Sequence, residues 1–359
     1  MNSTTARLLG CAAAALTTAT LTTNALAQTT ATVACSLDNT LYESTSGSVS
    51  NGKGPSIFAG LTAIGAKRRA VMQFDVASVV PAGAKILTAT LTLEVMQSTV
   101  VLPAPAYLHR VAQAWGEGTS IAPGGGGGGA ISTTNDATWA HRFYPATPWT
   151  NQGGDFAAVP SVTMSLPAIG VGTSPVSAGA TADAQFWLDN PSQNYGWILM
   201  TDELLPSTAR RINSREATSG QKPSLSVTYL AQGQNGTWGT GCPSGAGTFA
   251  NAFVGAPIGG STIGIVQTNA TPNSIGANYF ALELEPDGVP LPLPGCTVYL
   301  PLAQIIPGNV FLTTAGGTGG SPFNVPAGFP GYLINCQAVV LDPNPLGFLI
   351  SNSALICLQ

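Results

Sequence analysis

Alternating apolar and polar residues mark the clearest strand of this chain. Over residues 85–97, leucine, alanine and valine occupy every second position, and threonine and glutamate fill most of the positions between them. A period of two places alternate side chains on opposite faces of a sheet, so this segment is predicted to be a half-buried strand. Residues 224–230 repeat the pattern, and Leu225, Val227 and Tyr229 are predicted to face inward.

Short apolar runs separated by turn residues predict many further strands. They are expected at 55–60, 68–76, 106–114, 161–166, 195–201 and 209–214, and then at 247–254, 261–268, 277–285, 296–301, 331–341, 346–351 and 354–358. Glycine, proline and asparagine occupy the intervening turns. This pattern predicts an all-β fold, with an N-terminal antiparallel, jelly-roll-like β-sandwich and a second, smaller β-sandwich domain.

One helix and one domain boundary are also predicted. Residues 181–190 favour a helix that begins with Thr181 as N-cap and stops before Pro191. Residues 231–241 have the composition of a linker, which divides the chain into domains at 28–230 and 242–359. No repeat of 20–50 residues is present in the sequence, which excludes a solenoid or a propeller.

The composition agrees with an all-β protein and limits the classes of partner that we expect. The 359 residues include 43 glycines and 27 prolines, the two poorest helix formers, and only 8% are charged. The net charge is −4, and all 12 lysines and arginines precede residue 223. We therefore expect no nucleic-acid partner, because phosphate binding needs clustered basic residues.

The N-terminus has the features of an export signal. A single Arg7, an apolar stretch and the sequence Ala-Leu-Ala at 25–27 predict a secretory signal peptide over residues 1–27, cleaved before Gln28. A lipoprotein signal at Cys11 is the alternative, although this cysteine comes early for one. No later segment has the ~18 apolar residues of a membrane helix. We expect a secreted, extracellular or cell-surface protein without a membrane span.

Export changes the interpretation of the cysteines. The cleaved chain keeps five, namely Cys35, Cys242, Cys296, Cys336 and Cys357. Oxidising compartments favour disulfides, and an odd number leaves at least one thiol that is unpaired or makes an intermolecular bond. We predict the pairs Cys242–Cys296 and Cys336–Cys357 with Cys35 free, although four cysteines allow three pairings. The chain has no Cys-x-x-Cys motif or Cys/His cluster, which disfavours zinc.

An ordered set of motifs carries a family resemblance. Residues 38–43 read DNTLYE, and they are followed by SNGKG at 50–54, RRAVMQFD at 68–75, AWGEG at 114–118 and NSRE at 213–216. This set resembles the DNRLRE domain, a β-sandwich module of secreted bacterial and archaeal proteins. The resemblance implies a fold like that of carbohydrate-binding modules and a polysaccharide ligand, with alginate binding as the reference activity.

The C-terminal region is similar to a short module at the ends of other secreted bacterial proteins. GTGC at 239–242, PGCTVY at 294–299 and QAVVLDP at 337–343 carry this second resemblance. It implies export and supports the Cys242–Cys296 pair. It implies no activity.

A candidate ligand face lies in the loop-rich middle of the first domain. Its predicted residues are Trp115, Glu117, Trp139, Arg142 and Trp149, together with Arg215. Flat ring faces stack on the apolar faces of sugars, and the forked guanidinium suits a carboxylate-bearing sugar. The alternative is that the tryptophans fill the sandwich as core. Arg215 and Glu216 are expected to point to opposite faces of a strand, with Asp155 or Asp75 as partners.

Metal binding and catalysis have weaker signals. Asp38, Glu43 and Asn51 could hold a structural calcium ion on the sandwich loops, but no calcium-loop motif is present, so no cofactor is expected. A glycosidase would need two carboxylates, such as Glu117 with Asp136 or Asp155. We expect a secreted, non-catalytic polysaccharide-binding protein for acidic glycans. The alternative is a structural or adhesive surface or matrix protein without a sugar site, and a polysaccharide-degrading enzyme comes third.

Overall fold

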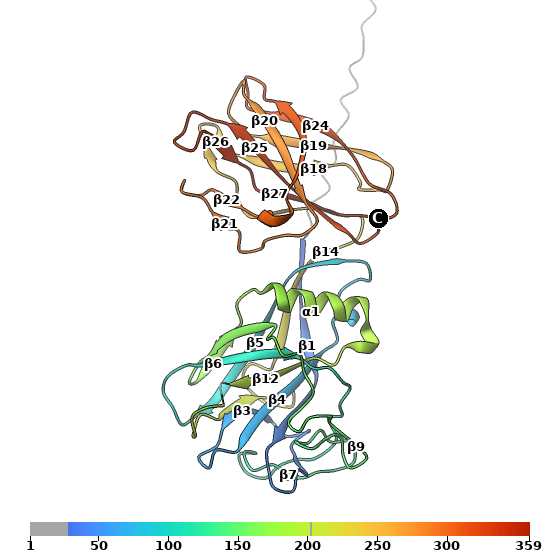
Figure 1. Cartoon of the computed structure of the whole chain (residues 1–359), viewed down its shortest axis with the longest axis vertical. Coiled ribbons are helices and arrows are strands. Elements are labelled where there is room, and N and C mark those ends of the chain that lie inside the picture. The colour runs from blue at the N-terminus through green and yellow to red at the C-terminus, as the bar shows by residue number, and fades with distance from the viewer. Residues whose placement is uncertain (1–27, 202) are drawn as a thin grey trace, which may run out of the picture.

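Two β-rich domains follow each other along the long axis of the molecule (Figure 1). The structure, a computed structural model, describes residues 28–201 and 203–359. The predicted signal peptide therefore lies outside the described residues. Antiparallel sheets and a single α-helix make up the described part of the chain, which confirms the all-β fold. In that part, no helix has the length and apolar character needed to cross a bilayer.

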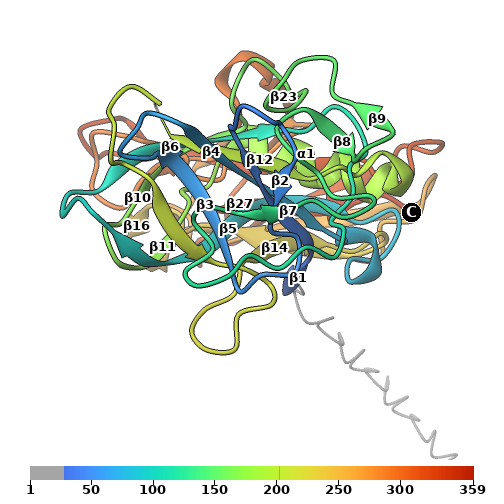
Figure 2. The same cartoon turned by 90° about the horizontal axis from the view of Figure 1, so that it is seen from below.

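The N-terminal domain consists of two antiparallel sheets packed face to face (Figure 2). The first contains β1 (Gln28–Tyr42), β14 (Ser224–Leu230), β5 (Lys85–Ser98), β13 (Arg210–Asn213), β3 (Ser56–Leu61) and β11 (Gly170–Thr173). The second contains β4 (Lys67–Phe74), β12 (Trp197–Thr201), β6 (Ala104–Arg110) and β10 (Val162–Leu166). Strands β1 and β3 each pair with strands of both sheets and so join them into one sandwich.

The core of this sandwich follows the alternation that the sequence shows. Leu91 and Leu93 of β5 and Leu225 and Val227 of β14 are buried together, while Thr90 and Thr92 of β5 are half-buried. Full burial of a leucine or valine side chain stabilises a fold by about 1.5–3 kcal/mol. The predicted strands at 85–97 and 224–230 are confirmed.

Helix α1 (Ala178–Asp189) closes one end of the sandwich. It begins earlier than predicted, because Ser177 rather than Thr181 is the N-cap and accepts a hydrogen bond from the Gly179 N–H. The helix ends at Asp189, as the following proline predicts. Trp187 anchors it in the core, where its ring meets that of Trp197 edge-on at 4.8 Å.

The C-terminal domain is a second, smaller sandwich. One sheet contains β15 (Asn235–Trp238), β27 (Ser353–Cys357), β25 (Leu333–Leu341), β20 (Ile275–Ala281), β23 (Ile306–Leu312) and β26 (Phe348–Ile350). The other contains β18 (Ala250–Val254), β19 (Thr262–Thr268) and β24 (Gly319–Asn324). Phe253 and Ile265 of the smaller sheet pack against Ile356 of the larger one. Strand β15 lies within the predicted linker at 231–241 and pairs with β27.

Short elements complete both domains. The remaining strands are β2 (Val49–Ser50), β7 (Ala130–Ile131), β8 (His141–Phe143), β9 (Thr147–Pro148), β16 (Pro243–Ser244), β17 (Gly247–Thr248), β21 (Val289–Pro290) and β22 (Thr297–Val298). Single 3₁₀ turns form at Val76–Ser78, Pro191–Gln193 and Leu302–Gln304. Strands β7, β8 and β9 belong to the loops at the end of the N-terminal domain that lies farthest from the C-terminal domain (Figure 1).

One of the two predicted disulfides is present. Cys242 and Cys296 are bonded, whereas Cys35, Cys336 and Cys357 are free and buried, so the predicted Cys336–Cys357 pair is wrong. Cys336 lies opposite Ala354 on the ladder between β25 and β27, and Cys357 lies opposite Leu333, three positions away. An odd offset places the two thiols on opposite faces of the sheet. Cys336 accordingly packs between the sheets, and Cys357 packs toward the other domain.

The two domains share an apolar interface. Leu87 and Leu230 of the first domain pack against Leu333, Leu355 and Cys357 of the second. Strand β14 ends at this interface, and helix α1 lies across the same end of the N-terminal domain (Figure 1).

Candidate functional site

The three predicted ligand-binding tryptophans are buried. Trp115, Trp139 and Trp149 are 5%, 7% and 4% exposed. They pack with Leu41, Val71 and other residues on the outer face of the second sheet. The prediction that these rings face solvent is therefore wrong, and the structure supports the alternative that they are core.

The outer face of the second sheet is apolar, which explains why these three indole rings are buried against it. Val71 of β4 and Ile198 of β12 point away from the sandwich core, whereas their neighbours Met72 and Leu199 point into it. A sheet that is apolar on both faces must be covered on both. The long loops between β6 and β10 supply Trp115, Trp139 and Trp149 as a third layer over this face.

Two indole N–H groups and one arginine of this layer bond to backbone carbonyls. Trp115 Nε1 donates to the Tyr195 carbonyl at 2.9 Å, and Trp149 Nε1 donates to the Thr138 carbonyl at 3.0 Å. Arg142, which is half-buried, donates through Nη1 to the Ala114 carbonyl at 3.1 Å and lies over the Phe143 ring. These residues therefore hold loops together.

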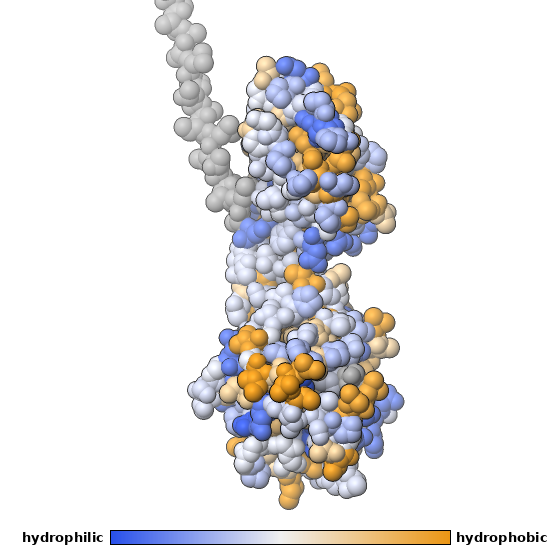
Figure 3. All heavy atoms as spheres, turned by 90° about the vertical axis from the view of Figure 1, so that its left-hand side faces the viewer, coloured by the Kyte–Doolittle hydropathy of each residue, from blue (hydrophilic) through white to orange (hydrophobic). Residues whose placement is uncertain are grey.

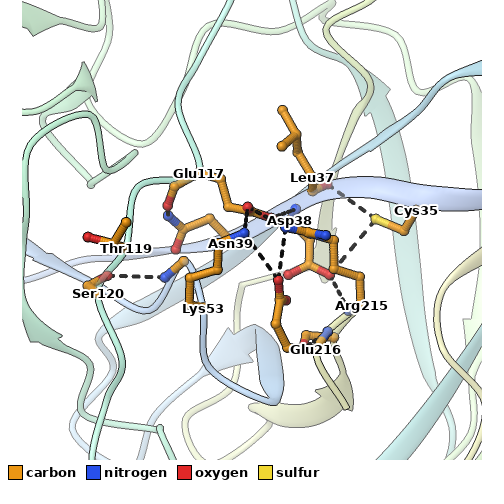
Figure 4. A network of polar contacts seen from close by, with 12 residues as sticks. Cys35, Leu37, Asp38, Asn39, Lys53, Glu117, Thr119, Ser120, Arg215 and Glu216 are labelled. Atoms are coloured by element: carbon orange, nitrogen blue, oxygen red, sulfur yellow. Dashed lines mark hydrogen bonds and ion pairs between the residues drawn. The ribbon is translucent and has the colours of Figure 1, made fainter. Parts of the chain in front are cut away.

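Glu117 and Arg215 do meet, in a network that sequence reasoning did not foresee (Figure 4). Arg215 Nε and Nη2 donate to the two carboxylate oxygens of Glu117 at 2.5 and 2.6 Å. Lys53 Nζ also contacts Glu117, and it lies 3.4 Å from Glu216 Oε1. With Asp38, these residues form a set that we call the acidic cluster: Asp38, Lys53, Glu117, Arg215 and Glu216.

Backbone contacts from separate segments position the acidic cluster. Asp38 lies on β1, and its Oδ2 accepts the Arg215 N–H at 2.6 Å, while its own N–H donates to Glu117 Oε1 at 3.0 Å. Asn39 Nδ2 donates to the Glu117 carbonyl at 2.9 Å. The chain turns directly after Glu117 at Gly118, whose φ is +69°. The network therefore ties β1 to two distant loops.

Arg215 and Glu216 are not arranged as the sequence predicts. They follow β13 in a turn, and both side chains face the acidic cluster, with Arg215 Nη2 3.0 Å from Glu216 Oε1. Neither of the predicted partners pairs with Arg215; Asp155 instead caps its own loop by accepting the Thr150 and Asn151 N–H groups at 2.7 and 2.8 Å. The prediction of opposite strand faces is wrong because β13 ends at Asn213.

Burial and charge set the protonation of the acidic cluster. Burial, with the charges of Glu216 and Glu117 added, raises the pKa of Asp38 to about 8 despite the Arg215 N–H. Burial, together with the charge of Glu117, also raises the pKa of Glu216 above its usual range. Burial also raises the pKa of Glu117, but the hydrogen bonds donated by Arg215, Lys53 and the Asp38 N–H outweigh burial, and the pKa is lowered. Asp38 is thus the group that carries a proton at neutral pH.

Two orphaned oxygens indicate where that proton lies. Asp38 Oδ1 and Glu216 Oε2 are buried atoms without a hydrogen-bond partner. Three carboxyl groups and two cations give the fully ionised cluster a charge of −1, and a single proton makes it neutral. A proton on Asp38 therefore removes the excess charge and one unsatisfied acceptor.

The acidic cluster does not fit a calcium ion as it stands. Oxygens of Asp38, Glu117 and Glu216 lie within 4.8 Å of one another, but both oxygens of Glu117 are already bound by Arg215. The predicted donors Glu43 and Asn51 are used elsewhere: Glu43 Oε2 accepts the Lys67 N–H, and Asn51 Oδ1 accepts the Ala122 N–H. Lys53 and Arg215 supply the positive charge that a divalent cation would bring.

The carboxylates considered for a glycosidase pair are each engaged by protein groups. Asp136 is fully buried and accepts the Thr133 N–H at 2.6 Å, and burial raises its pKa. Asp155 is occupied by its own loop, and Glu117 is held by two cations. General acid–base catalysis needs carboxyl groups that reach a substrate. Lys53 and Arg215, 33% and 29% exposed, are the most accessible members of the acidic cluster.

No family model matches this chain, and no curated protein is similar to it in sequence.

Proposed function

We propose that this chain is a non-catalytic structural or adhesive component of a cell surface or extracellular matrix, without a sugar site on the end loops of its first domain. The burial of Trp115, Trp139 and Trp149 carries the proposal. A sugar ring needs an open aromatic face to stack upon, and these three faces are covered by protein.

The polar residues of the predicted ligand face support the same conclusion. Arg215 is bidentate to Glu117, so the fork that would bind a sugar carboxylate already holds a protein carboxylate. Arg142 is bound to a backbone carbonyl. Loops that are cross-linked in this way make a rigid scaffold rather than an adaptable binding surface.

Sequence features support an extracellular place of action. The predicted export signal and the resemblance to DNRLRE domains both favour secretion. The Cys242–Cys296 bond is of the kind that forms and persists in an oxidising compartment. A scaffold with few charges and many tight turns suits a protein that assembles into or adheres to a surface layer.

Cell fractionation combined with affinity electrophoresis tests the proposal. The full chain is expressed in an exporting bacterial host, and we expect it in the washed cell-surface or matrix fraction. On gels that contain alginate, pectin or a neutral glucan, wild-type protein and Arg142→Ala should migrate identically. Retardation by alginate that Arg142→Ala abolishes would establish a sugar site on the end loops. Release of reducing sugar from any of these polymers would establish an enzyme.

A further inference from the structure

A groove lies between helix α1 and the C-terminal domain. It consists of two adjoining cavities of about 630 and 610 Å³, which share Lys85, Gln185, Asp189, Glu283 and Leu333 in their walls. We call this feature the interdomain groove. The space-filling view shows that the molecule narrows between its two domains (Figure 3).

The walls of the interdomain groove mix apolar and hydrogen-bonding groups. Phe186 of α1, Leu284, Pro286 and Pro301 contribute apolar surface to the first cavity, and Tyr332 contributes an exposed ring to the second. Amides stand among them, namely Gln185, Asn190 and Gln304. A concave site with apolar walls and a few polar groups is the usual form of a ligand site.

Negative charge is concentrated in this groove. Residues 231–359 contain no lysine or arginine and only four acidic residues, and three of those, Glu283, Glu285 and Asp287, line the first cavity. Asp189 joins them from the other side, and Lys85 is the single basic residue of either cavity. Among residues 28–201 and 203–359, no ion pair includes any of these five groups.

The C-terminal end of helix α1 adds to the negative electrostatic potential of the interdomain groove. Asp189 is the last residue of the helix, where the macrodipole is negative, and no basic residue lies in the last turn. Gln185 Nε2 donates to both Asp189 oxygens, at 3.1 and 3.2 Å, and so holds the carboxylate in place. A carboxylate at this position is unfavourable for the isolated helix, and a bound cation would relieve it.

The carboxylates of the groove do not converge in threes on one point, as a compact metal site built from side chains would require. Within the described part of the chain, the carboxylates that converge closely enough for one ion are those of the acidic cluster, and no group of the interdomain groove is among them. Charges that are spread along a groove match a ligand whose own charges are spread along a chain. The apolar walls and amides match a ligand that also has C–H faces and hydroxyl groups.

We propose that the interdomain groove binds an oligosaccharide of amino sugars whose amino groups are free and protonated. Ammonium groups pair with Asp189, Glu283, Glu285 and Asp287, hydroxyls bond to the amides of Asn190 and Gln304, and the sugar faces pack on the apolar walls. Acidic glycans are repelled by the same carboxylates. The proposal rests on the adhesive function proposed above, because it names the polymer through which the protein would adhere.

Calorimetric titration of the full chain tests this proposal. The probes are a glucosamine hexamer, an N-acetylglucosamine hexamer and spermine, at a pH below the pKa of the sugar amine. We expect the glucosamine hexamer to bind at least about tenfold more tightly than either other probe, and Glu283→Gln/Asp287→Asn to weaken it about tenfold. Asp342→Asn, which removes the one acidic residue of this domain outside the groove, should leave the affinity unchanged.

Other outcomes overturn the proposal. Equal affinity for the two hexamers would show that free amines are not recognised. Spermine binding as tightly as the glucosamine hexamer would show attraction of any polycation. Equal effects of Glu283→Gln/Asp287→Asn and Asp342→Asn would place the binding elsewhere. Absence of hexamer binding by a chain that is still found in the surface fraction would refute the groove and leave the adhesive function standing.

Discussion

Asp38→Asn changes one atom at the centre of the acidic cluster and removes its proton equilibrium. The carboxyl group of Asp38 is fully buried, its Oδ2 accepts the Arg215 N–H, and its Oδ1 has no partner. An asparagine can keep the first bond through its oxygen. Its neutral NH₂ group then takes the place of the buried, unpartnered Oδ1, as the protonated oxygen of an aspartic acid would.

The sign of the effect follows from the raised pKa of Asp38. The folded protein holds this proton up to a pH of about 8, whereas the unfolded chain releases it near pH 4. Between these values the unfolded state binds fewer protons, so the free energy of unfolding falls as pH rises, by about 1.4 kcal/mol per pH unit. At pH 7 the wild-type protein has lost about 4 kcal/mol from this group.

Urea unfolding at several pH values between 4 and 8 measures this loss. Tryptophan fluorescence is a suitable signal, because five of the six tryptophans, all but Trp238, belong to the N-terminal domain. We expect Asp38→Asn and wild type to be equally stable at pH 4, and the variant to be more stable by about 4 kcal/mol at pH 7. Parallel stability curves, or a variant less stable than wild type at pH 7, would refute a protonated Asp38.

Three further changes have outcomes that the structure predicts. Asp155 should behave oppositely to Asp38, because burial raises its pKa but the N–H donors of its loop outweigh burial and lower it. Asp155→Asn should therefore destabilise the protein by about 1–3 kcal/mol at pH 7. The stabilities of variant and wild type, measured by urea unfolding, should become equal below pH 4. Thiol titration of the unreduced chain from Gln28 should find no reactive cysteine when folded and three in denaturant, namely Cys35, Cys336 and Cys357; one would indicate a second disulfide. Gly118→Ala should cost more than about 2 kcal/mol by thermal unfolding, since an added Cβ would lie 1.7 Å from a buried carboxylate oxygen at a positive φ; unchanged stability would contradict this.

Strands with one buried face were predictable from the sequence. In most of β5 and in β14, one set of alternate positions packs in the core and the other set does not. The alternation of apolar and polar residue types therefore predicts the burial pattern. Strand β1 was missed altogether, because Gln28–Tyr42 consists largely of polar and small residues without a clear alternation. Its ladder bonds come from β14 and β4, which no local pattern reveals.

Third-layer packing was the main feature that sequence reasoning missed. A signal was present in β4 and β12, whose apolar residues run consecutively instead of alternating, as in strands covered on both faces. Val71 and Ile198 could therefore have predicted a covering layer. The choice of Trp115, Trp139 and Trp149 as that cover depends on long loops whose path no periodicity encodes.

Two residues of the acidic cluster were predicted from the sequence, but their contact with each other was not. Glu117 and Arg215 were singled out as polar residues with a function, and their mutual pairing is a tertiary contact between positions 98 residues apart. The mistaken Cys336–Cys357 pair has a similar cause, because its two strands were predicted but their register was not. Register decides which face each thiol occupies.

Iodide quenching of tryptophan fluorescence, in wild type and in Trp238→Phe, tests most directly whether the end loops are a scaffold. Trp115, Trp139, Trp149, Trp187 and Trp197 are all buried, and Trp238 is half-buried. We predict that the small quenchable fraction of the wild-type emission disappears in Trp238→Phe. Strong quenching that persists in this variant, and that replacement of Trp115, Trp139 and Trp149 by phenylalanine removes, would show open ring faces and contradict the account.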